Sequence, residues 1–222
     1  MTTYYPVYLN LRGRRCVIIG GGIVAEGKIS RLLDSGAEIC VVSPDATPGI
    51  RQFVADGAVR WEERKYQHGD LEGAFIAIAA TNVREVNQRI FEEANERGVM
   101  LNAVDDPPNC SFIAPSIVRR GPVTLAISTS GVSPALTRKL RESLQASEDL
   151  AWADLSGVMA TTRACLREMG MLTSVDPERW QSCITPQLLA MAQEGREAEA
   201  VEMLLAGLLD DSQEFPLPLG EG

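Results

Sequence analysis

The chain has 222 residues, 45% of them hydrophobic and 23% charged, a balance typical of folded globular proteins that excludes disordered and fibrous classes. Its formal net charge of −9 argues against a nucleic-acid-binding protein. No stretch approaches the roughly 18 consecutive apolar residues that a membrane span requires, and residues 1–15 show no signal-peptide pattern, so we expect a cytoplasmic protein.

The first half of the sequence alternates strand-like and helix-like segments. The apolar runs at Cys16–Ile19 and Ile39–Val42 lack polar alternation, which is typical of strands covered on both faces of a parallel sheet. Gly98 is a C-terminal stop signal for the helix before it. The alternation predicts a doubly wound α/β domain. Its other expected elements are helices over residues 46–56 and 83–97 and strands over residues 58–64, 74–81 and 99–104.

The pattern changes after Val104, where the loop DDPPNC is followed by two short β-like runs, residues 111–118 and 122–129. Pro115 assigns the first run to an edge or a bulge. Ser133 and Pro134 supply an N-cap and a first-turn proline for a helix to about residue 147. The rest is mainly helical, with breaks near Gly170 and at 176–177, and residues 214–222 form a frayed tail. We therefore expect a nucleotide domain at 1–110, a β segment with its helix at 111–147, and a helical domain at 148–222.

A glycine pattern lies between the first strand and the first helix. Gly20, Gly22 and Ala25 match G-x-G-x-x-A, in which the first glycine permits a tight turn and the second lets a pyrophosphate approach the backbone. Ile23 and Val24 begin the helix, whose free amides and positive dipole end favour phosphates. This context predicts a Rossmann-type dinucleotide site; the alternative is a strand-to-helix turn without a ligand.

The end of the second strand bears on cofactor preference. An acid is expected there to bind the ribose 2′-hydroxyl of NAD, and the chain offers Ser43, Pro44 and Asp45. No arginine lies immediately beside Ser43, and Arg51 is a remote candidate for a 2′-phosphate. We therefore favour NAD over NADP.

Polar residues follow two further strands at the edge where ligands of open α/β sheets bind. Thr81 and Asn82 either contact the cofactor or cap the next helix. Asp105 and Asp106 precede two prolines. A carboxylate there serves as a general base beside a nicotinamide, or the pair forms an ordinary turn.

Residues 107–141 contain five basic residues and no acidic one, a local excess that suits an anionic small molecule: Arg119, Arg120, Arg138, Lys139 and Arg141. The five cysteines are scattered, which favours buried free thiols, and the single histidine, His68, is expected in a surface loop. No stable metal site is predicted.

Three motifs occur in order and at matching spacing: GGGxVAxxK from Gly20 to Lys28, AATN from Ala79 to Asn82, and NAVDDPPNCSFIAPSIVRRGPVTLAISTSGVSPALTRKLRE from Asn102 to Glu142. Across residues 5–145 the sequence resembles the precorrin-2 dehydrogenase family, which includes the N-terminal module of siroheme synthase. The resemblance implies NAD-dependent dehydrogenation of precorrin-2 to sirohydrochlorin. In several members the same site also inserts ferrous iron, and we expect dehydrogenation without chelation here.

The resemblance also assigns residues. Asp105 matches the family's functional aspartate, proposed as a base. Donors for the carboxylates of precorrin-2 are expected from the basic segment and from Ser128, Thr129 and Ser130. The β segment and the following helices are expected to form a homodimer. Threonine stands at the position that some siroheme synthases phosphorylate, so regulation by phosphorylation is not carried over.

The methyltransferase domain of the fused enzymes is not in the 222 residues, so methylation would come from another protein. The competing hypothesis is a non-catalytic NAD(H) sensor, which explains the glycine pattern but not the combination of Asp105 with the basic segment.

Overall fold

The computed structural model describes residues 4–210. The chain divides into two compact units, Met1–Ala114 with Ser130–Val132, and Pro115–Thr129 with Ser133–Gly222. Each unit has a hydrophobic core of its own. The predicted tail at residues 214–222 lies outside the described residues.

The first unit is built on a parallel sheet whose five strands appear in the order β3-β2-β1-β4-β5. Its central strands are almost completely buried, which explains why their sequences lack polar alternation. The strand order reverses between β1 and β4, so their carboxyl ends define the switch point where ligands of such sheets bind. The strands are β1 (Arg15–Ile19), β2 (Glu38–Val42), β3 (Val59–Glu62), β4 (Ile76–Ala79) and β5 (Met100–Ala103).

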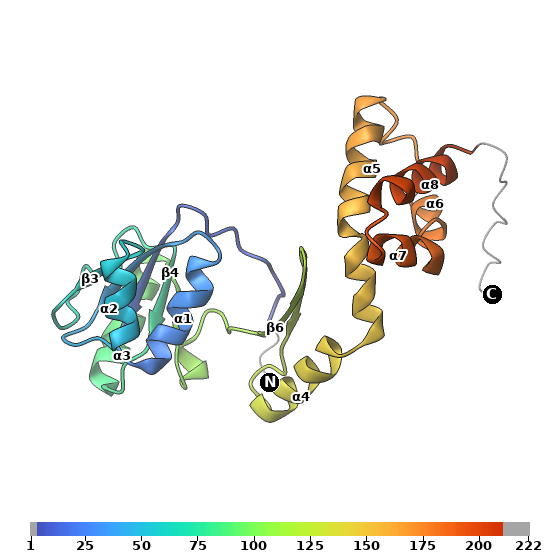
Figure 1. Cartoon of the computed structure of the whole chain (residues 1–222). Coiled ribbons are helices and arrows are strands. Elements are labelled where there is room, and N and C mark those ends of the chain that lie inside the picture. The colour runs from blue at the N-terminus through green and yellow to red at the C-terminus, as the bar shows by residue number, and fades with distance from the viewer. Residues whose placement is uncertain (1–3, 211–222) are drawn as a thin grey trace. The chain divides into compact units, whose positions relative to one another are not determined.

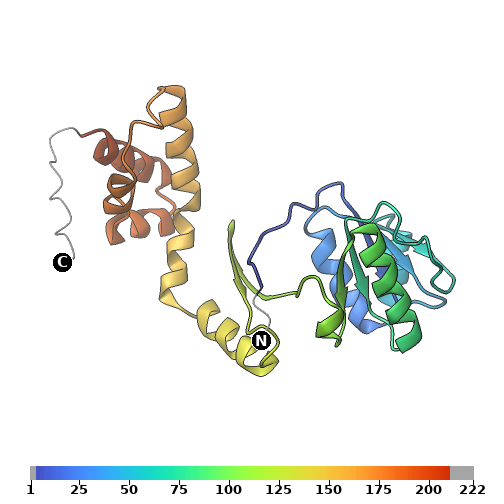
Figure 2. The same cartoon turned by 180° about the vertical axis from the view of Figure 1, so that it is seen from behind.

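Helices cover both faces of this sheet (Figures 1 and 2). The helices α1 (Ile23–Leu33) and α2 (Pro48–Ala55) pack on one face, and α3 (Arg84–Arg97) packs on the other. The side chain of Thr47 caps α2, so this helix begins two residues later than predicted. Gly98 ends α3 in the left-handed conformation with φ 66°, as expected.

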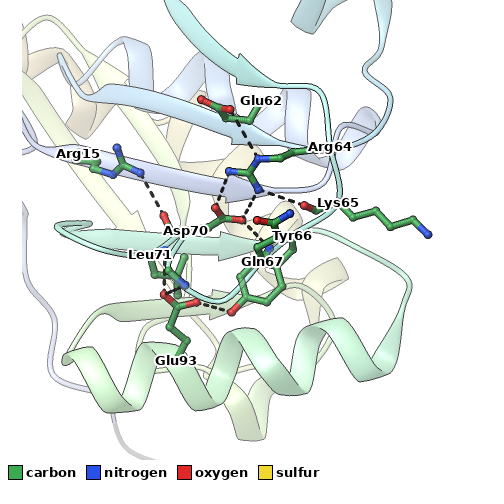
Figure 3. A network of polar contacts seen from close by, with 10 residues as sticks. Arg15, Glu62, Arg64, Lys65, Tyr66, Gln67, Asp70, Leu71 and Glu93 are labelled. Atoms are coloured by element: carbon green, nitrogen blue, oxygen red, sulfur yellow. Dashed lines mark hydrogen bonds and ion pairs between the residues drawn. The ribbon is translucent and has the colours of Figure 1, made fainter.

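A buried carboxylate ties α3 to the loop between β3 and β4 (Figure 3). Glu93 is 0% exposed, and its Oε1 accepts the amides of Gly69 at 2.9 Å and Leu71 at 3.2 Å. Its Oε2 accepts the Tyr66 hydroxyl, and Arg97 Nε donates to Oε1 at 2.8 Å. A buried carboxylate with four donors fixes the loop that leads into β4.

The second unit begins with the antiparallel hairpin of β6 (Ser116–Arg120) and β7 (Val123–Ile127). The strand predicted over residues 111–118 is therefore wrong in its first half. Proline has no amide to donate, and the residues before Pro115 bond back to β5 instead: Ser111 Oγ accepts the Leu101 amide at 2.7 Å, and Phe112 O accepts from Asn102.

Helices make up the rest of the second unit. Ser133 caps α4 (Pro134–Gln145) as predicted, by accepting the Leu136 amide at 3.1 Å. The breaks fall where they were expected, because Gly170 has φ 71° after α5 and Asp176 caps α6. A separate core forms around Leu166, Leu188 and Leu204. The remaining elements are a 3₁₀ segment, η2 (Glu148–Leu155), and the helices α5 (Ser156–Glu168), α6 (Pro177–Ser182), α7 (Pro186–Gln193) and α8 (Glu197–Leu209).

The α/β sheet followed by a small β segment and helices confirms the predicted fold class. No helix within residues 4–210 is long and apolar enough to span a membrane.

Candidate dinucleotide and active site

The glycine turn after β1 is held against both neighbouring strands. Gly20 has φ 121°, and a Cβ on it would lie 2.2 Å from the backbone oxygen of Ala80 at the end of β4. A Cβ on Gly21 would lie 2.0 Å from the backbone oxygen of Asp45, after β2. Neither position tolerates a side chain without backbone movement.

The N-terminus of α1 has the features of a phosphate site. Gly22 is the N-cap of α1, and no side chain of residues 4–210 accepts a hydrogen bond from the first amides of this helix. A Cβ added to Gly22 would meet no atom of these residues within 4 Å. Ile23 is 83% exposed and Val24 51% exposed, so the first turn of the helix is open to solvent. This open cradle, set beside two tightly packed glycines and at the positive end of the helix dipole, fits the pyrophosphate of a dinucleotide.

The three residues after β2 lie at the same edge of the sheet. Ser43 is buried at 7% exposure, whereas Pro44 and Asp45 are exposed. Asp45 Oδ1 accepts the Ala46 amide at 2.7 Å and Arg51 Nη2 at 2.7 Å. Hydrogen bonds from that amide and that guanidinium hold the pKa of Asp45 below its usual value. The guanidinium of Arg51, a remote candidate from the sequence, therefore contacts this loop from α2.

Thr81 and Asn82 follow β4. Thr81 Oγ1 accepts the amide of Val83, the N-cap of α3, at 3.1 Å, and Thr81 O accepts Asn87 Nδ2 at 3.0 Å. Asn82 is exposed. Thr81 thus shapes the turn into α3, and its role in cofactor binding stays a prediction.

Asp105 and Asp106 differ in their surroundings, although they are neighbours. Asp106 Oδ2 accepts Asn109 Nδ2 at 2.8 Å, so this carboxylate stabilises the short 3₁₀ turn η1 (Pro107–Asn109). Asp105 is exposed and left-handed, with φ 59°, and within residues 4–210 no hydrogen bond to its carboxylate is found. Non-glycine residues in this conformation are uncommon and concentrate at functional sites. Asp105 is the one of the two whose carboxylate is available for chemistry.

Cys110 fixes the backbone of the loop that contains Asp105 and Asp106. Its sulfur accepts the Ala103 amide at 3.2 Å and donates to the Ala103 carbonyl at 3.1 Å. Burial raises the pKa of this thiol, so it stays protonated as a donor. Cys110, Cys165 and Cys183 are only half-buried, whereas Cys16 and Cys40 are buried as expected.

Lys28 on α1 brings a positive charge near Asp105. Burial and the nearby Arg31 lower the pKa of this half-buried lysine, and the charges of Asp105 and Cys110 oppose that shift. The ammonium group therefore lies within Coulombic range of the Asp105 carboxylate. The sequence contained this residue at the end of the GGGxVAxxK motif, but without a role.

The second unit carries most of the predicted substrate-binding residues. Arg120 on β6 forms a bidentate ion pair with Asp154, with contacts of 2.7 and 2.6 Å, and thereby fastens β6 to η2. Thr129 Oγ1 accepts the Ser133 amide and lies 3.1 Å from Thr137 Oγ1, so it braces the start of α4. Ser128 immediately precedes Thr129 in the chain and is exposed.

The other predicted residues are more accessible. Arg138 and Lys139 are exposed on α4, and Arg138 also pairs with Glu142. Arg119 is exposed on β6. Ser130 has φ 52°, which makes it the second left-handed non-glycine residue in the described chain after Asp105. Within residues 4–210, no group of three or more His, Cys, Asp or Glu side chains could hold a metal ion.

The parallel sheet, its switch point and the glycine turn define a Rossmann-type dinucleotide-binding protein. Comparisons with known proteins agree: residues 7–116 match the putative NAD(P)-binding family model, and residues 120–147 match the central domain of sirohaem biosynthesis proteins.

The chain is 34% identical over 203 residues to "Siroheme synthase 1" of Serratia proteamaculans, covering 90% of this chain and 42% of that protein. It is 41% identical over 143 residues to "Siroheme synthase 3" of Aeromonas hydrophila, covering 64% of this chain and 31% of that protein. The chain thus spans about two fifths of the length of such relatives.

A solved structure, "SirC, precorrin-2 dehydrogenase", superposes with a TM-score of 0.72 at 27% identity, over 90% of this chain and 98% of that one. This likeness confirms the resemblance to precorrin-2 dehydrogenases that the motifs indicate.

Proposed function

We propose that this protein is an NAD-dependent dehydrogenase that converts precorrin-2 to sirohydrochlorin in sirohaem biosynthesis. The observation that carries the proposal is the exposed carboxylate of Asp105, which accepts no hydrogen bond from residues 4–210 and lies at the same sheet edge as the open glycine cradle. The match to a precorrin-2 dehydrogenase over 98% of that protein's length supports it.

NAD bound at this site would supply the hydride acceptor of the dehydrogenation. The amides at the start of α1 hold the pyrophosphate, and the residues after β2 and β4 orient the two ends of the dinucleotide. An Asp105 carboxylate oxygen takes the proton that leaves precorrin-2. The hydride removes two electrons and one hydrogen nucleus, and this proton is the second hydrogen lost. The left-handed backbone at Asp105, fixed through Cys110, aims that oxygen.

Precorrin-2 carries several carboxylates, and basic and hydroxyl donors suit them. We assign this role to Arg119, Arg138, Lys139 and the 128–130 segment. Arg120 contributes by holding β6 in place, because its guanidinium is occupied by Asp154.

A homodimer and a cytoplasmic location belong to the same proposal. The support for a dimer is an apolar stripe on α4: Leu136, Leu140 and Leu144 recur every four residues and are 50%, 40% and 37% exposed. A second copy of the chain would cover this stripe.

The test is an anaerobic assay of precorrin-2 and NAD in which NADH and sirohydrochlorin absorbance are followed together. The wild-type chain is expected to form both. Asp105→Ala should lower turnover about a hundredfold or more while NAD still binds, because the base is lost and the cradle is intact. Asp106→Asn is the matched control and should retain activity, since an asparagine still accepts from Asn109.

The other outcomes are also informative. Unchanged turnover in Asp105→Ala would exclude its role as the base. NADH binding without turnover by the wild-type chain would favour the sensor hypothesis. Ferrous iron added after sirohydrochlorin has formed tests chelation, and an insertion rate equal to that without enzyme is expected.

A further inference from the structure

A carboxylate of the loop after β2 and a guanidinium of α2 form an ion pair whose two members are each held by a further contact. Asp45 Oδ1 lies 2.7 Å from Arg51 Nη2, and the same oxygen accepts the Ala46 amide. The two side chains are 85% and 50% exposed, so both remain accessible to a ligand. The pair is thus a built feature of the loop that ligands can still reach.

Arg51 is anchored independently of Asp45. Its Nε donates to the Ala46 carbonyl at 3.0 Å, and its guanidinium carbon lies 4.7 Å from the centroid of the Trp61 ring. Trp61 is itself fixed, because its indole nitrogen donates to the Ser43 carbonyl at 3.0 Å. A guanidinium with a backbone anchor and an aromatic platform keeps its position when a neighbouring acid is removed.

This pair adjoins the glycine turn. The Asp45 carbonyl oxygen packs so closely on Gly21 that a Cβ there would lie 2.0 Å away, and the Thr47 amide donates to the Gly21 carbonyl at 2.9 Å. In dinucleotide folds, the end of the second strand meets the adenosine ribose, where an acid accepts the 2′-hydroxyl and an arginine accommodates a 2′-phosphate. Here both groups are present and form an ion pair.

We propose that the Asp45–Arg51 pair determines the 2′ specificity of the dinucleotide site, with Asp45 as the residue that suppresses a latent NADP site centred on Arg51. This inference rests on the proposed function, since it assumes that the glycine cradle binds a dinucleotide. Asp45 accepts the ribose hydroxyl and repels the 2′-phosphate dianion. Without that carboxylate, the anchored guanidinium offers a phosphate two parallel donors.

The experiment measures NADH and NADPH affinities of the full chain by fluorescence titration, without precorrin-2. The variants are Asp45→Asn, Asp45→Asn with Arg51→Met, and Asp56→Asn as a matched control. Asp56 is the C-cap of α2, and its carboxylate accepts Gln52 rather than a residue of the glycine turn. Each single variant removes one negative charge, so a general change in net charge affects both alike.

The wild-type chain and Asp56→Asn are expected to prefer NADH. Asp45→Asn should shift the NADPH-to-NADH affinity ratio toward NADPH by about tenfold or more, and the added Arg51→Met should abolish that gain. A ratio in Asp45→Asn within about twofold of the control overturns the inference while leaving the proposed function intact. Failure of the wild-type chain to bind either dinucleotide overturns both.

Discussion

The two glycines that flank the phosphate cradle have separable roles. Gly20 has a φ of 121°, and a Cβ on it would lie 2.2 Å from a backbone oxygen. A glycine is therefore needed at this position for the chain to fold. Gly22 has φ −84° and open space around it, so nothing in the described part of the chain forbids an alanine there. The space beside Gly22 is instead where the pyrophosphate would approach the backbone.

Gly20→Ala is therefore expected to lower the free energy of unfolding by about 2–4 kcal/mol, since a positive φ and a backbone clash add. Gly22→Ala should cost less than about 1 kcal/mol, the difference between glycine and alanine at an N-cap. It should nevertheless weaken NADH binding about tenfold or more, because the methyl group occupies the approach of the phosphates. Urea unfolding and NADH titration measure the two effects, and undiminished binding by Gly22→Ala would contradict the cradle.

The local parts of the site could be predicted from sequence, because a glycine turn, a helix start and a strand end are set by consecutive residues. The Asp45–Arg51–Trp61 arrangement could not, since it joins the β2 loop, α2 and β3 through tertiary contacts. The resemblance singled out Asp105 over Asp106, but the structural reason for the distinction could not be predicted. It depends on φ at Asp105 and on the side chain of Asn109.

At the scale of elements, all five strands of the parallel sheet were predicted. The strands β1, β2 and β4 are runs without polar alternation because they are buried on both faces, whereas β3 is only partly buried. The misplaced element was the run before Pro115, whose residues resemble a strand in sequence but bond to β5. The hydrogen bonds of Glu93 join α3 to the loop between β3 and β4. They could not be predicted, because a glutamate in a helix is ordinarily solvated, whereas Glu93 is buried.

Glu93 makes α3 sensitive to acid. Burial raises the pKa of Glu93, but the hydrogen bonds from Tyr66, Gly69, Leu71 and Arg97 outweigh it and hold the pKa below its usual value. A carboxylate whose pKa is lower in the folded state contributes stability above its unfolded pKa of about 4.3 and loses it as the pH falls further. Glu93→Gln, which has no charge to lose, should lack this contribution.

We expect Glu93→Gln to lower the free energy of unfolding by about 1–3 kcal/mol at pH 7, and the deficit to shrink at and below about pH 4. Urea unfolding across this pH range measures it. Glu92→Gln is the control, because Glu92 is exposed and pairs with Gln88 on the helix surface, and it should change stability by less than about 0.5 kcal/mol. His68, 3.9 Å from Glu93, is present in all three proteins. A loss of unfolding free energy in Glu93→Gln that is the same at every pH would contradict a stabilising role for the charge of Glu93.

At the scale of the whole molecule, the two units have separate cores. Both cores of the first unit are built on its sheet, and the helical core of the second surrounds Leu188. The helix α4 does not belong to that core, since no residue of α4 is buried. Its leucines are nevertheless spaced as one continuous face, which is the pattern of a helix that a partner covers.

Leu140→Glu tests whether that partner is a second copy of the chain. Burying a leucine stabilises an interface by about 1.5–3 kcal/mol, and a charge at the centre of the stripe removes that contribution and adds a desolvation cost. The wild-type chain should therefore sediment as a dimer and Leu140→Glu as a folded monomer with an unchanged circular dichroism spectrum. Gln145→Glu places the same charge about 140° away around α4 and should remain dimeric. A monomeric wild-type chain, or a dimer that survives Leu140→Glu, would show that the stripe is not the interface between copies.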